Sequence, residues 1–295
     1  MKKKIAFIGA GRMATAIVKG LIQKKVYTSD EIVCTSGDDD TATILAQESG
    51  ITAVDSLLPF VPEVETLVLA CKPQQLDQIN SSILEQAAHI TLISILAGTP
   101  IRRLSESFPR VKNIIRSMPN TPGQIGCGST AYATLNPLET EELQLIERIL
   151  GALGTVHSVS ESQIDAITAL SGSGPAYVFE FISALIDAGT KAGLDGNLAK
   201  TLAIETVIGS AKLLKKSESS PEDLRNAVTS PGGTTEAALN TLSENDFLLE
   251  LESDKNTLKS LFSKAGQYDC PCRRKKMTNA DWQKYKNGYM QKVWK

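Results

Sequence analysis

The sequence has little of several features that would narrow its function at once. Only two of its 295 residues are histidines, and aromatic residues make up 5%. No apolar run reaches the ~18–20 residues that a membrane-spanning helix needs, so we expect no membrane segment. The formal net charge is only −2. A chain of this balance is not built, taken whole, to hold nucleic acid.

The five cysteines are an odd number in a long chain. Cys34, Cys71 and Cys127 are scattered among apolar or small residues, which is typical of a reduced compartment, so we expect a cytoplasmic protein. Cys270 and Cys272 lack the nearby histidines or second cysteine pair of a metal motif, and no metal is expected.

The near-neutral total hides an asymmetry. Residues 264–295 carry nine Lys/Arg and two Asp/Glu, a net charge of +7, so residues 1–263 carry −9. Both tryptophans and three of the six tyrosines lie in this basic end. It could bind RNA or an anionic surface, dock as a helix on the acidic remainder, or be an accessory end without a catalytic role. We favour the last.

The chain opens with a pattern typical of a dinucleotide site. Residues 5–8 form an apolar run that predicts a buried strand, and apolar residues recur at helical spacing over residues 16–22. Between them, Gly9 permits a tight turn, Gly11 lets the backbone approach a pyrophosphate, and Ala14 lets the helix pack close to the strand. The start of this helix would present free N–H groups to the phosphates.

The next predicted strand, residues 31–34, bears on which dinucleotide binds. A site that prefers NAD places an acidic residue at its end to bind the ribose 2′-hydroxyl. Here the strand ends in Thr35, Ser36 and Gly37, which leave room and donors for a 2′-phosphate. Three aspartates at 38–40 would repel that phosphate if they pointed inward, but we expect them to cap the following helix. We predict NADPH as cofactor, with NADH weaker.

Three further apolar runs alternate with predicted helices, at residues 66–70, 90–95 and 113–116. This alternation predicts an α/β Rossmann domain with a doubly wound parallel sheet and a ligand crevice at the carboxyl ends of its strands. Lys72 follows the first of these runs. The pattern alone fits a cofactor contact and an ordinary surface lysine equally.

Beyond about residue 160 the strand signals stop and helical patterns take over. We expect a helix over residues 164–170, a break at 171–177 in which Pro175 starts a new helix, and a further helix over 198–214. Apolar residues surround much of each helix, as in a bundle formed between subunits. The expected fold class is therefore a Rossmann domain followed by an all-α dimerisation domain.

Residues 230–235 read Ser-Pro-Gly-Gly-Thr-Thr between two predicted helices. Glycines followed by hydroxyl residues at a helix start form a nest for an anion, either a phosphate or a substrate carboxylate. The alternative is an ordinary cap, with Thr234 or Thr235 starting a surface helix and Gly232 and Gly233 serving as a linker.

Together these motifs resemble those of the pyrroline-5-carboxylate reductase family. The matching segments, in the family's order, are residues 8–14, 72–74, 94–98, 118–122, 170–177 and 228–235. The resemblance implies a helical domain that dimerises by intertwining, active sites at the subunit boundary, and dimers that can assemble further. It also implies an NADP-binding domain at 1–160 and a dimerisation and substrate domain at 161–265. The basic, aromatic tail at 266–295 lies outside the resemblance, and its role is unknown.

The resemblance assigns roles to individual residues. Those implied in cofactor binding are Ile8, Gly9, Ala10, Gly11, Arg12, Met13, Thr35, Ser36, Ala70, Cys71, Lys72, Pro73, Ala97 and Glu161. Those implied in holding the substrate are Ser230, Gly232, Gly233, Thr234 and Thr235. Catalytic roles fall to Thr235 near the ring nitrogen, to Ser230, and to Glu218 close to the substrate.

The reaction implied is the NAD(P)H-dependent reduction of 1-pyrroline-5-carboxylate to L-proline, the final step of proline biosynthesis. A protonated cyclic imine accepts hydride readily, so alignment over the cofactor can supply much of the rate without a strong general acid. We accordingly expect His89 and His157 to be structural. The alternatives are a related NADPH-dependent cyclic-imine or β-hydroxyacid reductase, the latter with Lys191 as base, and a non-enzymatic NADP-binding module.

Overall fold

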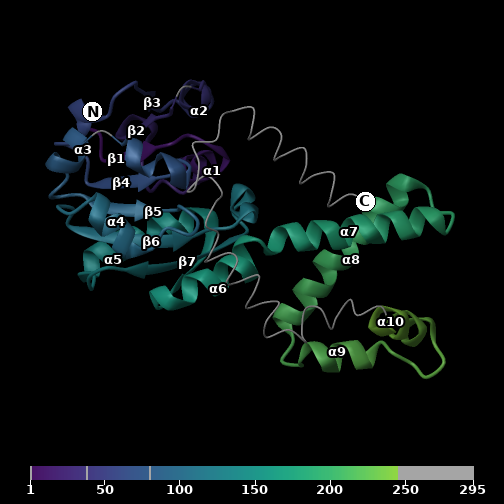
Figure 1. Ribbon diagram of the computed structural model, residues 1–295. Helices are drawn as coiled ribbons and strands as arrows, with labels where there is room; N and C mark the ends of the chain where they lie inside the picture. The colour runs from purple at the N-terminus through teal and green to yellow at the C-terminus, as the bar shows by residue number, and fades with distance from the viewer. Residues whose placement is uncertain (1, 38, 80, 245–295) are drawn as a thin grey trace, which may run out of the picture.

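The computed structural model describes residues 2–37, 39–79 and 81–244. They form two parts, a body built on one eight-stranded sheet and an arm of helices that extends from it (Figure 1). We call the described part of residues 2–160 the Rossmann body and residues 161–244 the helical arm. The expected order, an α/β Rossmann fold followed by an all-α segment, is confirmed.

Strands and helices alternate in the body, whereas the arm is helical. The strands are β1 Ile5–Ile8, β2 Ile32–Thr35, β3 Thr52–Ala53, β4 Thr66–Leu69, β5 Thr91–Ser94, β6 Asn113–Met118, β7 Gly128–Thr134 and β8 Gly154–Ser158. The α-helices of the body are α1 Arg12–Gln23, α2 Thr41–Ser49, α3 Ser81–Gln86, α4 Ile101–Ser107 and α5 Thr140–Leu150. Those of the arm are α6 Ile164–Ile167, α7 Gly174–Lys191, α8 Gly196–Lys216, α9 Pro221–Ala227 and α10 Thr234–Glu244.

The sheet has the order β3-β2-β1-β4-β5-β6-β7-β8. The first six strands are parallel and doubly wound, as predicted. The expectation of a wholly parallel sheet is wrong at its far edge, because β7 pairs antiparallel to β6 and β8 follows the direction of β7. Only a short segment joins Met118 to Gly128, whereas a parallel crossover takes a dozen or more residues.

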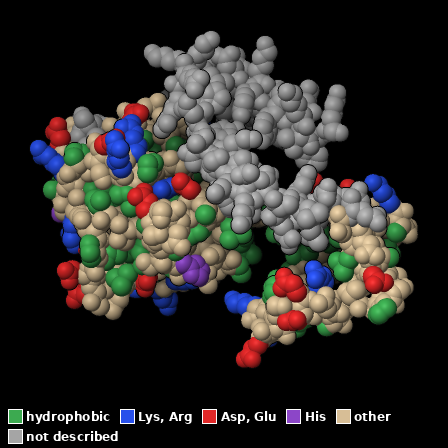
Figure 2. Space-filling model, turned by 60° about the horizontal axis from the view of Figure 1, so that its bottom comes forward, with side chains coloured by type: hydrophobic (Ala, Val, Ile, Leu, Met, Phe, Trp, Pro, Cys, Tyr) green, Lys and Arg blue, Asp and Glu red, His purple; other side chains and the backbone are tan. Residues whose placement is uncertain are grey.

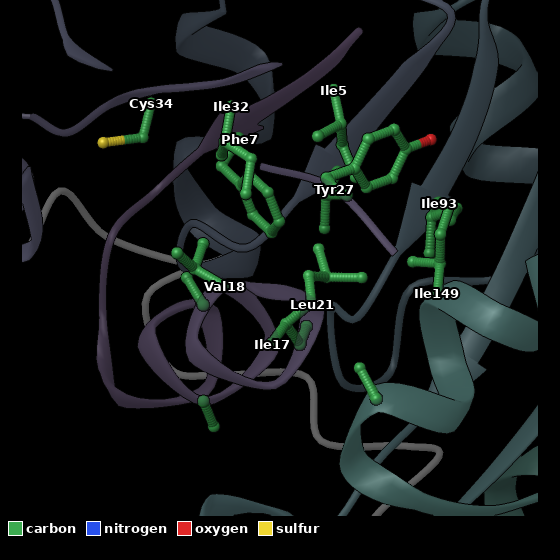
Figure 3. Close-up of a cluster of buried hydrophobic side chains, with 14 of the residues drawn as sticks. Ile5, Phe7, Ile17, Val18, Leu21, Tyr27, Ile32, Cys34, Ile93 and Ile149 are labelled. Atoms are coloured by element: carbon green, nitrogen blue, oxygen red, sulfur yellow. The ribbon is translucent and has the colours of Figure 1, made fainter. Parts of the chain in front are cut away.

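Buried side chains on both faces of the sheet hold the body together. On one face, α1 packs through Ile17, Val18 and Leu21 against strand residues that include Phe7 and Ile32 (Figure 3). These five side chains are at most 2% exposed, and burying each contributes about 1.5–3 kcal/mol. Alternate residues of the same strands point the other way and join a second buried cluster with α4.

The arm begins as a nearly continuous helical run that is interrupted at Ser173, within the break predicted at residues 171–177. The run passes through a π-type turn at Thr168–Gly172, and Pro175 lies in the first turn of α7 as expected. The turn packs on the body: a Cβ added to Gly172 would lie 3.2 Å from the sulfur of Met118. The Asn120 amide also donates to the Ser171 hydroxyl at 3.2 Å. These contacts explain why the chain stays helical here.

The arm does not bury its own apolar side chains. No residue of α7 is buried, and α8 buries only Ala199 and Ala203. Apolar side chains are visible at the surface of the arm in Figure 2. The exposed large apolar residues are Leu170, Tyr177, Val178, Phe179, Phe181, Leu185, Leu194, Leu198, Leu202, Ile208, Leu213, Leu214, Val228 and Leu242. A surface of this kind marks an interaction site.

The run Glu161–Lys191 is long and apolar enough to cross a membrane, by length and composition alone. Charged residues such as Glu180 and Asp187 interrupt this run, so it is not an uninterrupted apolar stretch. Helices that pack between two subunits have the same composition, since they are apolar on more than one side.

One buried cation ties the arm to the body. Arg116 on β6 is 5% exposed in its side chain, and its guanidinium pairs with Glu161 at 3.2 Å and Asp165 at 2.6 Å. The Glu161 carboxylate also accepts the N–H of Ile101, at the start of α4, at 2.6 Å. Because a buried charge is costly without a partner, these two carboxylates hold the start of the arm against β6.

The double variant Glu161→Gln with Asp165→Asn should lower the free energy of unfolding by about 3–5 kcal/mol, because it leaves Arg116 buried without a counter-charge. Arg116→Met should cost less, because the carboxylates left behind are 37% and 48% exposed and can be hydrated. Glu106→Gln breaks an exposed pair with Arg102 and is the control, with a change under about 0.5 kcal/mol. Urea unfolding followed by circular dichroism measures all three, and a larger loss for Arg116→Met would contradict this ranking.

Candidate active site

Four parallel strands end at the same level of the sheet. Ile8 pairs with Thr35 on one side and with Leu69 on the other, and Leu69 pairs with Ser94. The turns that follow these strands therefore lie side by side at one carboxyl edge. The predicted cofactor residues that the structure brings to this edge are Ile8, Gly9, Ala10, Gly11, Arg12, Met13, Thr35, Ser36, Ala70, Cys71, Lys72, Pro73 and Ala97.

The two glycines of the first turn are required for different reasons. Gly9 has a φ of +101°, and a Cβ there would lie 2.5 Å from the carbonyl carbon of Ala70. Its N–H donates to the carbonyl of Thr35 at 2.8 Å, so only glycine fits between β2 and β4. Gly11 is the N-cap of α1 without a side-chain cap, and open space surrounds the position of its absent Cβ.

This turn leaves room for an anion. A cavity of about 360 Å³ lies between α1 and α2, and its lining includes Gly11, Arg12, Thr41 and Ile44. The first turn of α1 carries no acidic residue, so no carboxylate there opposes an anion at the positive end of the helix dipole. The residues present fit the phosphates of a dinucleotide.

The turn after β2 contains three aspartates, which could either point toward a bound 2′-phosphate or cap α2. Asp39 accepts hydrogen bonds from the N–H of Thr41, at 3.0 Å, and from its hydroxyl. These bonds hold the pKa of the Asp39 carboxyl below its usual value. Asp40 occupies the N-cap position of α2 without a side-chain bond, and Asp38 lies outside the described residues. The expected capping of α2 is therefore made by Asp39.

The turn after β4 reaches toward the turn after β2. The backbone N–H of Lys72 donates to the side chain of Gln75 at 2.9 Å, and the Gln75 amide nitrogen lies 3.4 Å from where a Cβ on Gly37 would be. Lys72 itself is exposed. Burial raises the pKa of the neighbouring Cys71 thiol, which disfavours its thiolate.

Glu161 lies apart from these turns, at the joint between body and arm. Its carboxylate is engaged by the guanidinium of Arg116 and by the N–H of Ile101. Sequence reasoning missed Arg116, which gave no local signal of its buried partners. A contact between Glu161 and the cofactor stays a prediction.

The predicted substrate loop joins α9 to α10. Gly232 has a φ of +70°, and Gly233 lies so close to the Ser230 hydroxyl that a Cβ would approach it to 2.5 Å. The N–H of Gly232 donates to the carboxylate of Glu236 at 2.7 Å. The loop thus binds a carboxylate from its own helix, which favours the anion nest over a plain linker. Sequence reasoning missed Glu236, although an acid in the first turn of a helix was a usable signal.

The loop and the carboxyl edge do not meet within one chain. Figure 1 shows α9 and α10 on the arm, away from the end of the sheet that carries the glycine turn. Thr235, in the first turn of α10, and the exposed Glu218 between α8 and α9 share this position. The two groups of predicted residues therefore occupy separate parts of the chain. Within residues 2–37, 39–79 and 81–244, no group of His, Cys, Asp or Glu is placed to hold a metal.

Two segments match known families. Residues 161–252 match the family described as pyrroline-5-carboxylate reductase dimerisation. Residues 4–98 match the family described as NADP oxidoreductase, coenzyme F420-dependent.

Curated relatives align over most of the chain. A pyrroline-5-carboxylate reductase of Synechocystis is 39% identical over 84% of this chain and 92% of the relative. One of Pseudomonas aeruginosa is 35% identical over 86% of this chain and 93% of the relative. Pyrroline-5-carboxylate reductase 2 of Bos taurus is 34% identical over 98% of this chain and 88% of the relative. This last alignment extends into the basic end, residues 264–295, which contains none of the motifs shared with the family.

Solved structures agree. Plasmodium falciparum pyrroline carboxylate reductase, with NADP bound, has a TM-score of 0.80 and 29% identity over 90% of this chain and 97% of that one. A Coxiella burnetii pyrroline-5-carboxylate reductase has a TM-score of 0.78 and 33% identity over 90% and 98%. With a relative 39% identical over most of its length and a dimerisation segment of the same name, the chain belongs to the pyrroline-5-carboxylate reductase family.

Proposed function

We propose that the protein reduces 1-pyrroline-5-carboxylate to L-proline with NADPH. The observation that carries this is the presence of two anion-receiving helix starts in one chain. The glycine turn before α1 suits the phosphates of a dinucleotide, and the loop before α10, where Gly232 already binds a carboxylate, suits the substrate. The reductase name of the curated relatives supports the assignment.

In this proposal the cofactor lies along the carboxyl edge of the sheet. The start of α1 receives its phosphates, Thr35 and Ser36 face its adenosine ribose, and Ala70 and Ala97 line its nicotinamide end. When bound, the nicotinamide supplies the hydride. The NADP bound to the Plasmodium falciparum relative supports this cofactor type, and NADH is proposed as a weaker alternative.

The substrate is held by the loop before α10. Backbone N–H groups at Gly232, Gly233 and Thr234 orient its carboxylate, and the Ser230 hydroxyl adds a donor beside them. The Thr235 hydroxyl, one residue into α10, bonds the ring nitrogen. The imine arrives protonated, so these residues need only align the ring rather than donate a proton. Glu218 lies near the substrate and favours its positive charge.

Two copies of the chain complete the site. The arms join through their exposed apolar faces, and the 230–235 loop of one copy faces the carboxyl edge of the other. Apolar contact of this extent is typical of permanent homodimers, and the dimerisation match covers the arm. Dimers can assemble further.

The domain limits that we propose are residues 1–160 for NADP binding and 161–265 for dimerisation and substrate. The tail at 266–295 lies outside the described residues, and neither nucleic acid nor membrane is proposed as a partner. Cys34, Cys71 and Cys127 are free thiols, which supports a cytoplasmic location.

The β-hydroxyacid alternative requires a lysine base. Lys191 is exposed in the last turn of α7, where its charge complements the negative end of the helix dipole. That role explains the residue without catalysis and makes this alternative weaker.

Purified protein should consume NADPH and form L-proline from 1-pyrroline-5-carboxylate, with a higher kcat/KM than for piperideine-6-carboxylate or β-hydroxyacids. The loop and the glycine turn suit a small carboxylate and a dinucleotide, which is the physical reason. Absorbance of NADPH and chromatography of proline measure this. Binding of NADPH without turnover of any of these compounds would support the non-enzymatic module instead.

Thr235→Ala should lower kcat/KM for the imine by roughly 10- to 100-fold, because a hydrogen bond to a charged group is lost. Thr235→Ser retains the hydroxyl and is the matched control, with activity close to that of the unaltered protein. Steady-state kinetics at saturating NADPH measures both. Wild-type kcat/KM in the alanine variant would refute the role of this hydroxyl.

Phe179→Glu should convert the dimer to monomers and abolish activity, because this side chain on α7 is 63% exposed in the single chain and would be buried between arms. Leu135→Glu alters an apolar side chain of the Rossmann body that is 44% exposed and should leave both properties intact. Sedimentation velocity and the reductase assay measure the outcome. An active monomeric Phe179→Glu protein would contradict a site shared between copies.

A further inference from the structure

Asp39 takes three donors at the end of β2 and the start of α2, whereas the Thr35 hydroxyl donates to the carbonyl of Asp55 at 3.4 Å. The Ser36 hydroxyl donates to the backbone carbonyl of Asp39 at 2.9 Å. The N–H and the hydroxyl of Thr41 both donate to the Asp39 carboxylate. Asp39 therefore accepts from both hydroxyls and from the backbone donor that a phosphate would use at this place.

This place is where the two nicotinamide dinucleotides differ. In a Rossmann fold the adenosine ribose lies at the end of the second strand, and a 2′-phosphate projects from it in NADPH but not in NADH. Thr41, the partner of Asp39, also lines the cavity of about 360 Å³ beside Gly11 and Arg12. Asp39 is thus bonded to a residue that lines this cavity, although it does not line the cavity itself.

Two charged side chains act on an anion at this place, the negative Asp39 and the positive Lys72. Hydrogen bonds from Thr41 hold the pKa of Asp39 below its usual value, and the positive charge of Lys72 acts in the same direction. The carboxylate is therefore ionised near neutral pH and repels an incoming phosphate. The positive charge of Lys72 would attract the phosphate, but it already interacts with the Asp39 carboxylate. The 2′-hydroxyl of NADH carries no charge and meets no such repulsion.

We infer that Asp39 sets the preference between NADPH and NADH by acting as an internal competitor for the donors of the 2′-phosphate. The inference rests on the proposed function, since it assumes that a nicotinamide dinucleotide binds at the carboxyl edge. Thr35, Ser36 and Gly37 alone would favour NADPH over NADH. The inference is that the Asp39 side chain makes this preference smaller.

Calorimetric titration with 2′,5′-ADP and with 5′-AMP tests this without turnover. Asp39→Asn should bind 2′,5′-ADP roughly tenfold more tightly, because it removes one negative charge at close range, and its 5′-AMP affinity should not change. Asparagine keeps an oxygen that accepts from Thr41, so the start of α2 is preserved. Asp40→Asn removes the same charge one residue away, at a side chain without a cap bond, and is the matched control.

The gain in 2′,5′-ADP affinity should be several times larger for Asp39→Asn than for Asp40→Asn, and it should shrink as salt screens the charge. In steady state, the KM for NADPH should fall relative to the KM for NADH. Equal gains in the two variants, or no gain in Asp39→Asn, would overturn the inference. A protein that reduces no imine would defeat the proposed function, yet the titrations would still decide the role of Asp39.

Discussion

The helical arm cannot bury its own apolar faces, and much of the molecule's organisation follows from that constraint. The Rossmann body closes its core on both faces of the sheet, whereas α7 buries nothing and α8 buries only two alanines. A helix that is apolar on several sides is stable in water only when something covers it. Within residues 161–244, no other element of the arm covers these faces. The loop that we propose for the substrate lies in the same segment, residues 161–252, that matches the dimerisation family, so in our proposal assembly and catalysis depend on the same apolar surface.

The site that we propose is divided between body and arm, so it requires a fixed angle between them. If the arm turned on the body, the loop of one copy would shift against the carboxyl edge of the other. The joint resists this in two ways. Arg116 is buried between two carboxylates of the arm, and the π-type turn packs through Gly172 against Met118, at the end of β6. Both contacts are made by residues of β6, so the arm is held in its orientation mainly by this strand. Errors of about 1 Å in alignment are costly in catalysis, so a rigid joint has chemical value.

The sequence predicted features that depend on residues close together in the chain, and it did not predict features that depend on distant ones. The buried strands and the glycine turn depend on neighbours along the chain, and local periodicity was enough to find them. The partners of Arg116 lie 45 and 49 residues away, and no local pattern identifies them. The direction of β7 follows from a short connection whose path only the fold shows. The π-type turn before Ser173 was not predicted, because contacts with Met118 and Asn120 offset the local tendency of glycine and serine to end a helix.

Two helix starts, those of α2 and α10, are partnered by carboxylates of the chain itself, whereas the start of α1 is not. Asp39 engages the start of α2, and Glu236 engages the loop before α10. Such bonds satisfy N–H groups that a helix start leaves without partners, so the loops stay ordered before any ligand arrives. An anion that took the place of such a carboxylate would gain as affinity only the surplus of its interaction. Selectivity becomes a difference between two anions competing for the same donors. An internal carboxylate at such a position both satisfies the donors of the loop and competes with any anion that would use them, so the two acids, as well as the glycines beside them, shape the proposed site.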